Sequence, residues 1–138
     1  MNIADFCVRI NHKSFSIKKS KFSKKFSKFF NGISSIRKNN FIDTKNSRLN
    51  EAISNVFGSL RAYSEDKNKS LKLIFKDVNI YDLYLAVKWE RLYNSEILQY
   101  SIDNMITSIS RKNYEEILKF VKKYKIYEVE DACRKFRE

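Results

Sequence analysis

Few residues in this 138-residue sequence have the types and spacing that enzymatic chemistry requires. The sequence contains one histidine, His12, which is therefore the one histidine available to activate a serine nucleophile. It falls in a polar run that favours an exposed turn, where a base is poorly placed to reach a nucleophile. We therefore predict that His12 has no part in nucleophilic catalysis.

Two acidic clusters could supply carboxylates for acid–base chemistry: Glu115 with Glu116, and Glu128 with Glu130 and Asp131. Both clusters fall in segments with a helical pattern, and neighbouring positions on a helix point in different directions. Such clusters are usually solvated helix faces that form ion pairs within the helix. The clusters therefore predict charged surface rather than a catalytic pair.

Metal, cofactor and phosphate-loop chemistry also lack the necessary residues. Cys7, Cys133 and His12 are the only cysteine and histidine residues, and they are too few and too widely spaced for a zinc site. Two glycines, Gly32 and Gly58, cannot form a glycine-rich phosphate loop. We predict a non-enzyme with no catalytic, cofactor-binding or metal-binding residues.

The location of the protein follows from hydropathy and cysteine usage. The sequence has no run of about 18 apolar residues, and its first residues include an acid where a signal peptide would be apolar. We expect an intracellular protein, cytoplasmic or nuclear, that is not secreted. The two cysteines could form a disulfide on their number alone, but a reducing compartment favours two buried free thiols.

The positive charge is concentrated near the N-terminus. The formal net charge is +12, and residues 6–42 contain ten basic and no acidic residues, against 18 basic and 16 acidic residues elsewhere. Such a segment would attract phosphates or an acidic protein surface. The sequence also has 20 Lys and 13 Asn but five Ala, so part of the lysine excess could reflect an AT-biased gene. The candidate contact residues are Arg9, Lys13, Lys18, Lys19, Lys21, Lys24, Lys25, Lys28, Arg37 and Lys38.

The apolar pattern predicts an α+β fold with a small sheet. Alternating apolar residues in 6–10 and 15–17 predict a β-hairpin around a polar turn at 11–14. The apolar residues of 71–75 predict a further short strand that could pair with the hairpin. Residues 33–47 have no sustained period and predict a surface loop.

About six helices should cover this sheet. Phe22, Phe26, Phe29 and Phe30 form one stripe of a helix over residues 20–30, and we assign them to the core. Further stripes predict helices from residue 47 to about 60, 81–93, 98–109, 114–124 and from 127. We expect Asn113 to cap the helix at 114–124 by its side chain, and Phe136 to point inward from the helix that starts at 127. One domain over residues 1–138 is the expectation for this length.

This order of elements, with certain residues in it, resembles the BTB/POZ domain over residues 6–137. The matching stretches are FSIKKSKFSKKFSKFF at 15–30, LIFKDV at 73–78, the helix at 81–93, and NYEEILKFVKKYKIYEVEDAC at 113–133. Lys18 stands where the family usually has histidine, and the connection at 33–70 is longer than usual.

The resemblance implies a BTB/POZ-like fold and a role as an adaptor or in homodimerisation. It does not extend to the contact with cullin-type ubiquitin ligases, because residues 78–82 lack the aliphatic-x-Glu element expected before the third helix. An ion-channel role has no support either.

Two hypotheses for function remain. In the first, the protein is an interaction module for a protein partner or a second copy of itself. In the alternative, the basic residues of 6–42 bind phosphates, and the protein docks on a ribosome or another structured RNA. Membrane-surface binding by residues 20–30 would need the phenylalanine stripe to face outward, whereas we expect the core to need it.

Overall fold

The computed structural model describes residues 6–10, 13–17, 40–62, 70–89 and 92–137. The chain divides into two compact units, residues 1–98 and residues 99–138. A unit of about 40 residues is small for an independent domain. The single domain expected over residues 1–138 therefore stays a prediction.

The first unit contains a three-stranded sheet with the strand order β2-β1-β3. Strands β1 (Phe6–Ile10) and β2 (Lys13–Ile17) pair antiparallel, and β3 (Asn40–Ile42) pairs parallel with β1. The predicted hairpin is thus confirmed. Ile10, Phe15 and Ile42 are buried and form the core side of this sheet.

Two details of the sheet differ from the sequence prediction. Lys13 and Ser14, which were expected in the turn, belong to β2. Residues 40–42, which were expected in a loop, form β3. A three-residue strand is too short to show an alternating pattern, and β3 pairs with a strand about thirty residues earlier, so local sequence could not reveal it.

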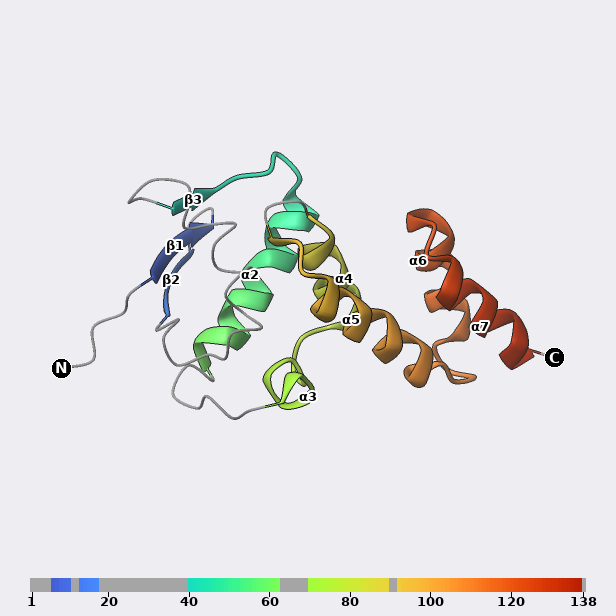
Figure 1. The fold of residues 1–138 in the computed structure, drawn as a ribbon. Coiled ribbons are helices and arrows are strands. Elements are labelled where there is room, and N and C mark those ends of the chain that lie inside the picture. Colours follow the sequence, from blue (N-terminus) through green and yellow to red (C-terminus); the bar gives the residue numbers. More distant parts are fainter. Residues whose placement is uncertain (1–5, 11–12, 18–39, 63–69, 90–91, 138) are drawn as a thin grey trace. The chain divides into compact units, whose positions relative to one another are not determined.

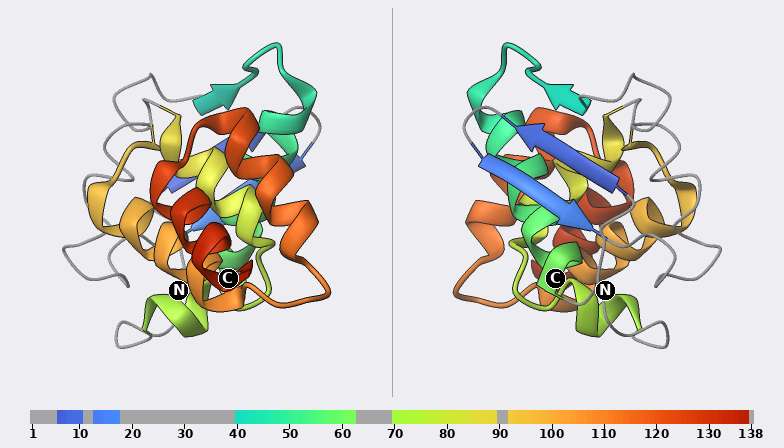
Figure 2. Two further views of the ribbon diagram at one scale, coloured as in Figure 1. Left: turned by 90° about the vertical axis from the view of Figure 1, so that its right-hand side faces the viewer. Right: turned by 90° about the vertical axis from the view of Figure 1, so that its left-hand side faces the viewer.

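Helix α2 (Ser47–Ala62) lies between the hairpin and α4 (Ile80–Lys88), and it contacts both (Figures 1 and 2). The predicted stripe faces these neighbours, since Ile53, Val56 and Phe57 have no exposed surface. The ring of Phe57 lies 6.3 Å from that of Phe15 on β2. The helix predicted from residue 47 is therefore confirmed, together with its buried face.

The strand predicted at 71–75 is wrong, because these residues form the short helix α3 (Leu71–Ile74) and the turn that follows it. The Ser70 hydroxyl accepts a hydrogen bond from the Leu73 amide, and Phe75 N–H donates to the Leu71 carbonyl. A short apolar run suits a strand or a buried helical turn equally, and here the Ser70 cap starts a helix. This segment carried part of the BTB/POZ resemblance.

Helix α4 begins after Asn79, whose side-chain oxygen accepts a 2.8 Å hydrogen bond from the Tyr81 amide. It ends at Lys88, and Trp89 is extended, so the helix is shorter than the predicted 81–93. Helix α5 (Ser95–Ser108) begins in the first unit and continues into the second. The predicted helix at 98–109 is thus confirmed with an earlier start.

The second unit consists of the rest of α5 with α6 (Tyr114–Tyr124) and α7 (Tyr127–Arg137), which pack against each other (Figure 1). Lys125 links α6 to α7 in the left-handed conformation, with φ of 57°. Four side chains of the two helices are fully buried: Ile117, Val121, Val129 and Cys133.

The sequence predicted that the side chain of Asn113 caps α6. This prediction is wrong, because Asn113 precedes α6 but its side chain makes no capping hydrogen bond. Its Oδ1 instead accepts a 2.7 Å hydrogen bond from the Ser110 amide, and its Nδ2 donates to the Ser108 carbonyl at 2.7 Å. The side chain therefore braces the turn between α5 and α6.

The phenylalanine helix predicted at 20–30 lies outside the described residues, as does residue 12. Within the described part of the chain, no helix is long and apolar enough to cross a membrane.

Candidate functional site

The structure describes two of the ten predicted contact residues, Arg9 and Lys13, and both are exposed. Arg9 lies opposite Ser14 in the hairpin, whereas Lys13 lies opposite Ile10. Because paired residues share a face and successive residues alternate, Arg9 and Lys13 lie on opposite faces of the sheet. The remaining eight lie outside the described residues: Lys18, Lys19, Lys21, Lys24, Lys25, Lys28, Arg37 and Lys38.

Glu130 and Cys133, two residues considered above for possible chemistry, make contacts that serve the fold. Glu130 pairs with Arg134 at 2.7 Å, as expected for an ion pair within a helix. Cys133 is buried and forms no disulfide, so the predicted free thiol is confirmed there. Burial, with a smaller contribution from Glu130, raises the pKa of the Cys133 thiol. No group of three or more potential metal ligands occurs in the segments that the structure describes.

The most deeply buried charge described in the first unit is the carboxylate of Asp82 on α4, whose side chain is 6% exposed. Nη1 of Arg48 on α2 lies 2.5 Å from its Oδ1, and Nδ2 of Asn55 donates to its Oδ2 at 2.7 Å. Both partners of the carboxylate belong to α2, so this cluster holds α4 against α2. We assign it to the fold rather than to a site.

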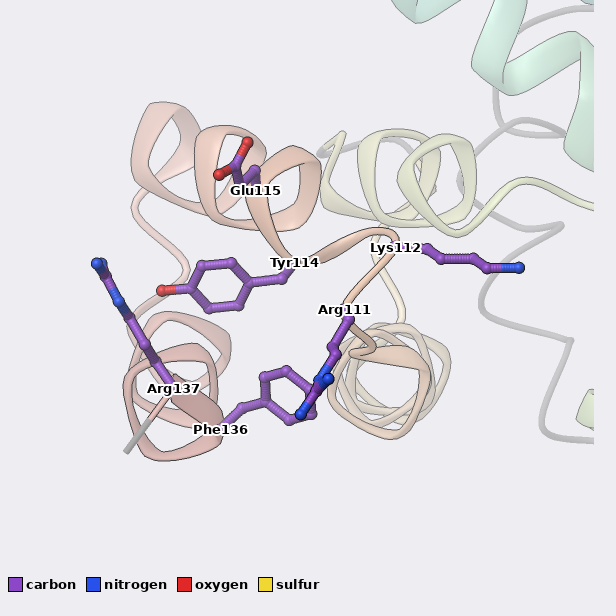
Figure 3. Close-up of a pocket in the computed structure, with 6 residues that line it drawn as sticks. All are labelled: Arg111, Lys112, Tyr114, Glu115, Phe136 and Arg137. Atoms are coloured by element: carbon purple, nitrogen blue, oxygen red, sulfur yellow. The ribbon is translucent and has the colours of Figure 1, made fainter.

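The second unit carries a hollow of about 350 Å³ where the beginning of α6 meets the end of α7 (Figure 3). A second hollow adjoins it and shares two of its lining residues, Tyr114 and Arg137. We call the two together the α6–α7 groove. Its lining residues are Arg111, Lys112, Tyr114, Glu115, Leu118, Lys122, Arg134, Phe136 and Arg137.

Two stacked aromatic rings line the groove. The ring centroids of Tyr114 and Phe136 are 6.1 Å apart, and their planes differ by 27°. Phe136 is 45% exposed, so the prediction that it points inward is wrong. Val129 and Cys133 form the buried stripe of α7, and Phe136 lies one turn beyond Cys133, close to the end of the helix. The stacked pair therefore leaves apolar surface open to a partner.

Cationic side chains surround this pair. Figure 3 shows Arg137 beside the hydroxyl end of Tyr114 and Arg111 beside Phe136, while Lys112 and Glu115 point away from the two rings. In the described part of the chain, none of the ion pairs involves Arg111, Lys112, Lys122 or Arg137. Arg134 differs, because it pairs with Glu130 and Asp131.

The sequence predicted the helices of this groove but not the groove. Tyr114 and Phe136 are 22 positions apart, and they meet because α6 and α7 fold back on each other. The signal was available in part: an aromatic residue beside basic residues begins the first helix, and another ends the second. Placing the two predicted helices side by side would have brought these ends together.

Comparison of the sequence with protein-family models found no matching family, and searches of curated proteins and of solved structures found no significant match.

Proposed function

We propose that this protein is a non-enzymatic interaction module that binds a protein partner through the α6–α7 groove. The observation that carries the proposal is the stack of Tyr114 on the exposed ring of Phe136, flanked by Arg111 and Arg137 without ion-pair partners among the described residues. Aromatic residues and arginine are enriched in protein interfaces and dominate their binding energy.

The adaptor or homodimerisation role implied by the BTB/POZ resemblance belongs to this proposal. Its support lies in residues 113–133, which form α6, the turn and most of α7. The support is weaker at 73–78, where a helix and a turn replace the expected strand. A second copy of the chain is thus one of the partners that a test must detect.

To test the proposal, a photoreactive benzophenone side chain would replace Leu118, which lines the groove. Lys119 is the matched control, because it is exposed on the same helix but does not line the groove. We expect irradiation in an extract of the source cells to give a protease-sensitive adduct from position 118 and not from position 119. An adduct of two copies of the chain would identify a homodimer.

Two results would contradict the proposal. The first is the absence of any adduct from position 118, and the second is the same set of adducts from both positions. A nuclease-sensitive adduct would instead favour the RNA candidate.

RNA binding is a second candidate, because residues 6–42 contain ten basic and no acidic residues and because Arg9 and Lys13 are exposed. Reversing the charge of Lys21, Lys24, Lys25 and Lys28 should abolish co-sedimentation with purified ribosomes. Wild-type co-sedimentation that survives a change from about 50 to about 200 mM salt would indicate specific docking rather than general phosphate attraction. Failure to sediment with ribosomes or mixed RNA at either salt concentration would eliminate this candidate.

A further inference from the structure

We infer that the α6–α7 groove receives a short acidic segment of its protein partner, an inference that rests on the proposed function. In this arrangement an apolar side chain of the partner packs on Tyr114 and Phe136. Carboxylates on either side of it pair with Arg111 and Arg137. The inference adds the chemistry of the partner to the general proposal of protein binding.

The charge of the groove favours carboxylates as its complement. Four of its cations take part in no ion pair among the described residues: Arg111, Lys112, Lys122 and Arg137. Arg137 lines both hollows, so a single guanidinium can contact groups placed in either one. A guanidinium binds a carboxylate through two parallel N–H donors, and this match gives orientation as well as attraction.

The apolar part of the groove favours a peptide over a free anion. Phe136 is 45% exposed, and Leu118 adds an aliphatic wall to the second hollow. A small anion would leave this surface in water, whereas a side chain of a peptide would bury it. Two adjoining hollows of about 350 Å³ each are large enough for side chains, but not for a folded domain.

Acidic residues in and beside the groove argue against a nucleic-acid strand. Glu115 lines the first hollow, and Glu130 and Asp131 neutralise Arg134 of the second. The whole C-terminal unit has nine basic and seven acidic residues, which is a small excess for a chain of phosphates. A strand would need a continuous cationic track, whereas a peptide with two or three carboxylates needs the separate cations found here.

The test uses the full chain and defined peptide pools. The probe is an equimolar pool of 12-residue peptides composed of Asp, Glu, Leu and Phe, and the control pool has Asn and Gln in place of Asp and Glu. Retention of each pool on the immobilised protein would be measured by mass spectrometry. We expect at least tenfold greater retention of the acidic pool.

Matched variants would test whether the peptides bind in the groove. Arg137→Glu and Lys135→Glu make the same change of charge two positions apart on α7, but Lys135 does not line the groove. Phe136→Ala and Tyr127→Ala each remove an exposed aromatic side chain from α7, and Tyr127 does not line the groove either. We expect Arg137→Glu and Phe136→Ala to lose at least tenfold in retention of the acidic pool, and both controls to retain it.

Equal retention of the two pools, or equal effects of Arg137→Glu and Lys135→Glu, would overturn the inference. Retention of a ten-nucleotide oligouridine that Arg137→Glu abolishes would overturn it in favour of RNA. A protein adduct at position 118 without retention of the acidic pool would reject this partner chemistry but keep the proposed function. Absence of the adduct would reject the proposed function itself.

Discussion

Two regions of this protein use arginine in opposite ways. Arg48 in the first unit pairs with the buried carboxylate of Asp82 and thereby holds two helices together. Arg137 in the second unit takes part in no ion pair among the described residues and lies beside Tyr114, which stacks on the exposed ring of Phe136. A charge paired with a buried carboxylate contributes to folding, whereas a charge left beside open apolar surface is available to a partner.

The two regions also differ in whether their cations are numerous or are gathered at one place. Residues 6–42 contain ten basic and no acidic residues, yet the two that the structure describes lie on opposite faces of a hairpin. Residues 99–138 have nearly balanced charges, yet four cations without ion-pair partners among the described residues gather around one groove. The position of cations relative to their partners is therefore a better guide to a site than the sum over a segment.

The largest loss of stability is expected from substitution of Arg48, the arginine that pairs with Asp82. Arg48→Met leaves the carboxylate of Asp82 buried without its counter-charge, and we expect a loss of about 3 kcal/mol in the free energy of unfolding. Urea unfolding followed by circular dichroism would measure it, with Arg137→Met as the matched control. A loss below about 1 kcal/mol would remove the distinction between the two arginines.

A smaller loss is expected from the buried side of α7, the helix that also carries the groove. Cys133 has no exposed surface, so Cys133→Ser places a hydroxyl in the core at a cost of about 2 kcal/mol. Because burial raises the pKa of this thiol, the unfolded chain loses the proton at a lower pH than the native chain does. The difference between wild type and variant should therefore shrink as the pH rises above about 9, in urea unfolding measured across that range.

A still smaller loss of stability is expected from the cap of α4, the helix that carries Asp82. Asn79→Ala removes the acceptor for the Tyr81 amide, and loss of such a cap costs about 1 kcal/mol. Asn79→Asp keeps an acceptor oxygen and should restore most of the stability in thermal unfolding. If both variants unfolded at the same temperature, the side-chain cap would not be the cause.

The smallest effect on stability is expected at the groove. Arg137→Glu should change the free energy of unfolding by no more than about 0.5 kcal/mol, because exposed side chains without ion pairs contribute little. The variant should therefore fold while losing the acidic peptides. A large loss of stability would show that Arg137 belongs to the fold, as Arg48 does.

Long periodic segments were predictable from the sequence, and short ones were not. The stripe with Ile53, Val56 and Phe57 located α2 and its buried face, and the alternation of residues 6–17 located the hairpin. The run at 71–75 is too short for its period to distinguish strand from helix, and the Ser70 cap decides for a helix. Strand β3 depends on pairing with β1, which no local pattern encodes.

The candidate site was less predictable than the fold. Local sequence directed attention to the lysines of residues 18–28, where charge density is highest. The groove instead depends on Tyr114 and Phe136, which meet only when α6 and α7 pair. Phe136 fits the apolar spacing of α7, but its position near the end of the helix leaves it partly uncovered. Periodicity identifies which side of a helix is apolar. It does not show which residues on that side are left exposed because no neighbouring element packs on them.

The short connection between α6 and α7 has a consequence for how the groove would bind. Lys125 and Ile126 alone join the two helices, and the Ile126 amide donates a 2.9 Å hydrogen bond to the Val121 carbonyl. The walls are thus set at a fixed spacing by a tight turn and a shared core before any partner arrives. A preorganised site loses little conformational entropy on binding, so a short segment can be held by few contacts.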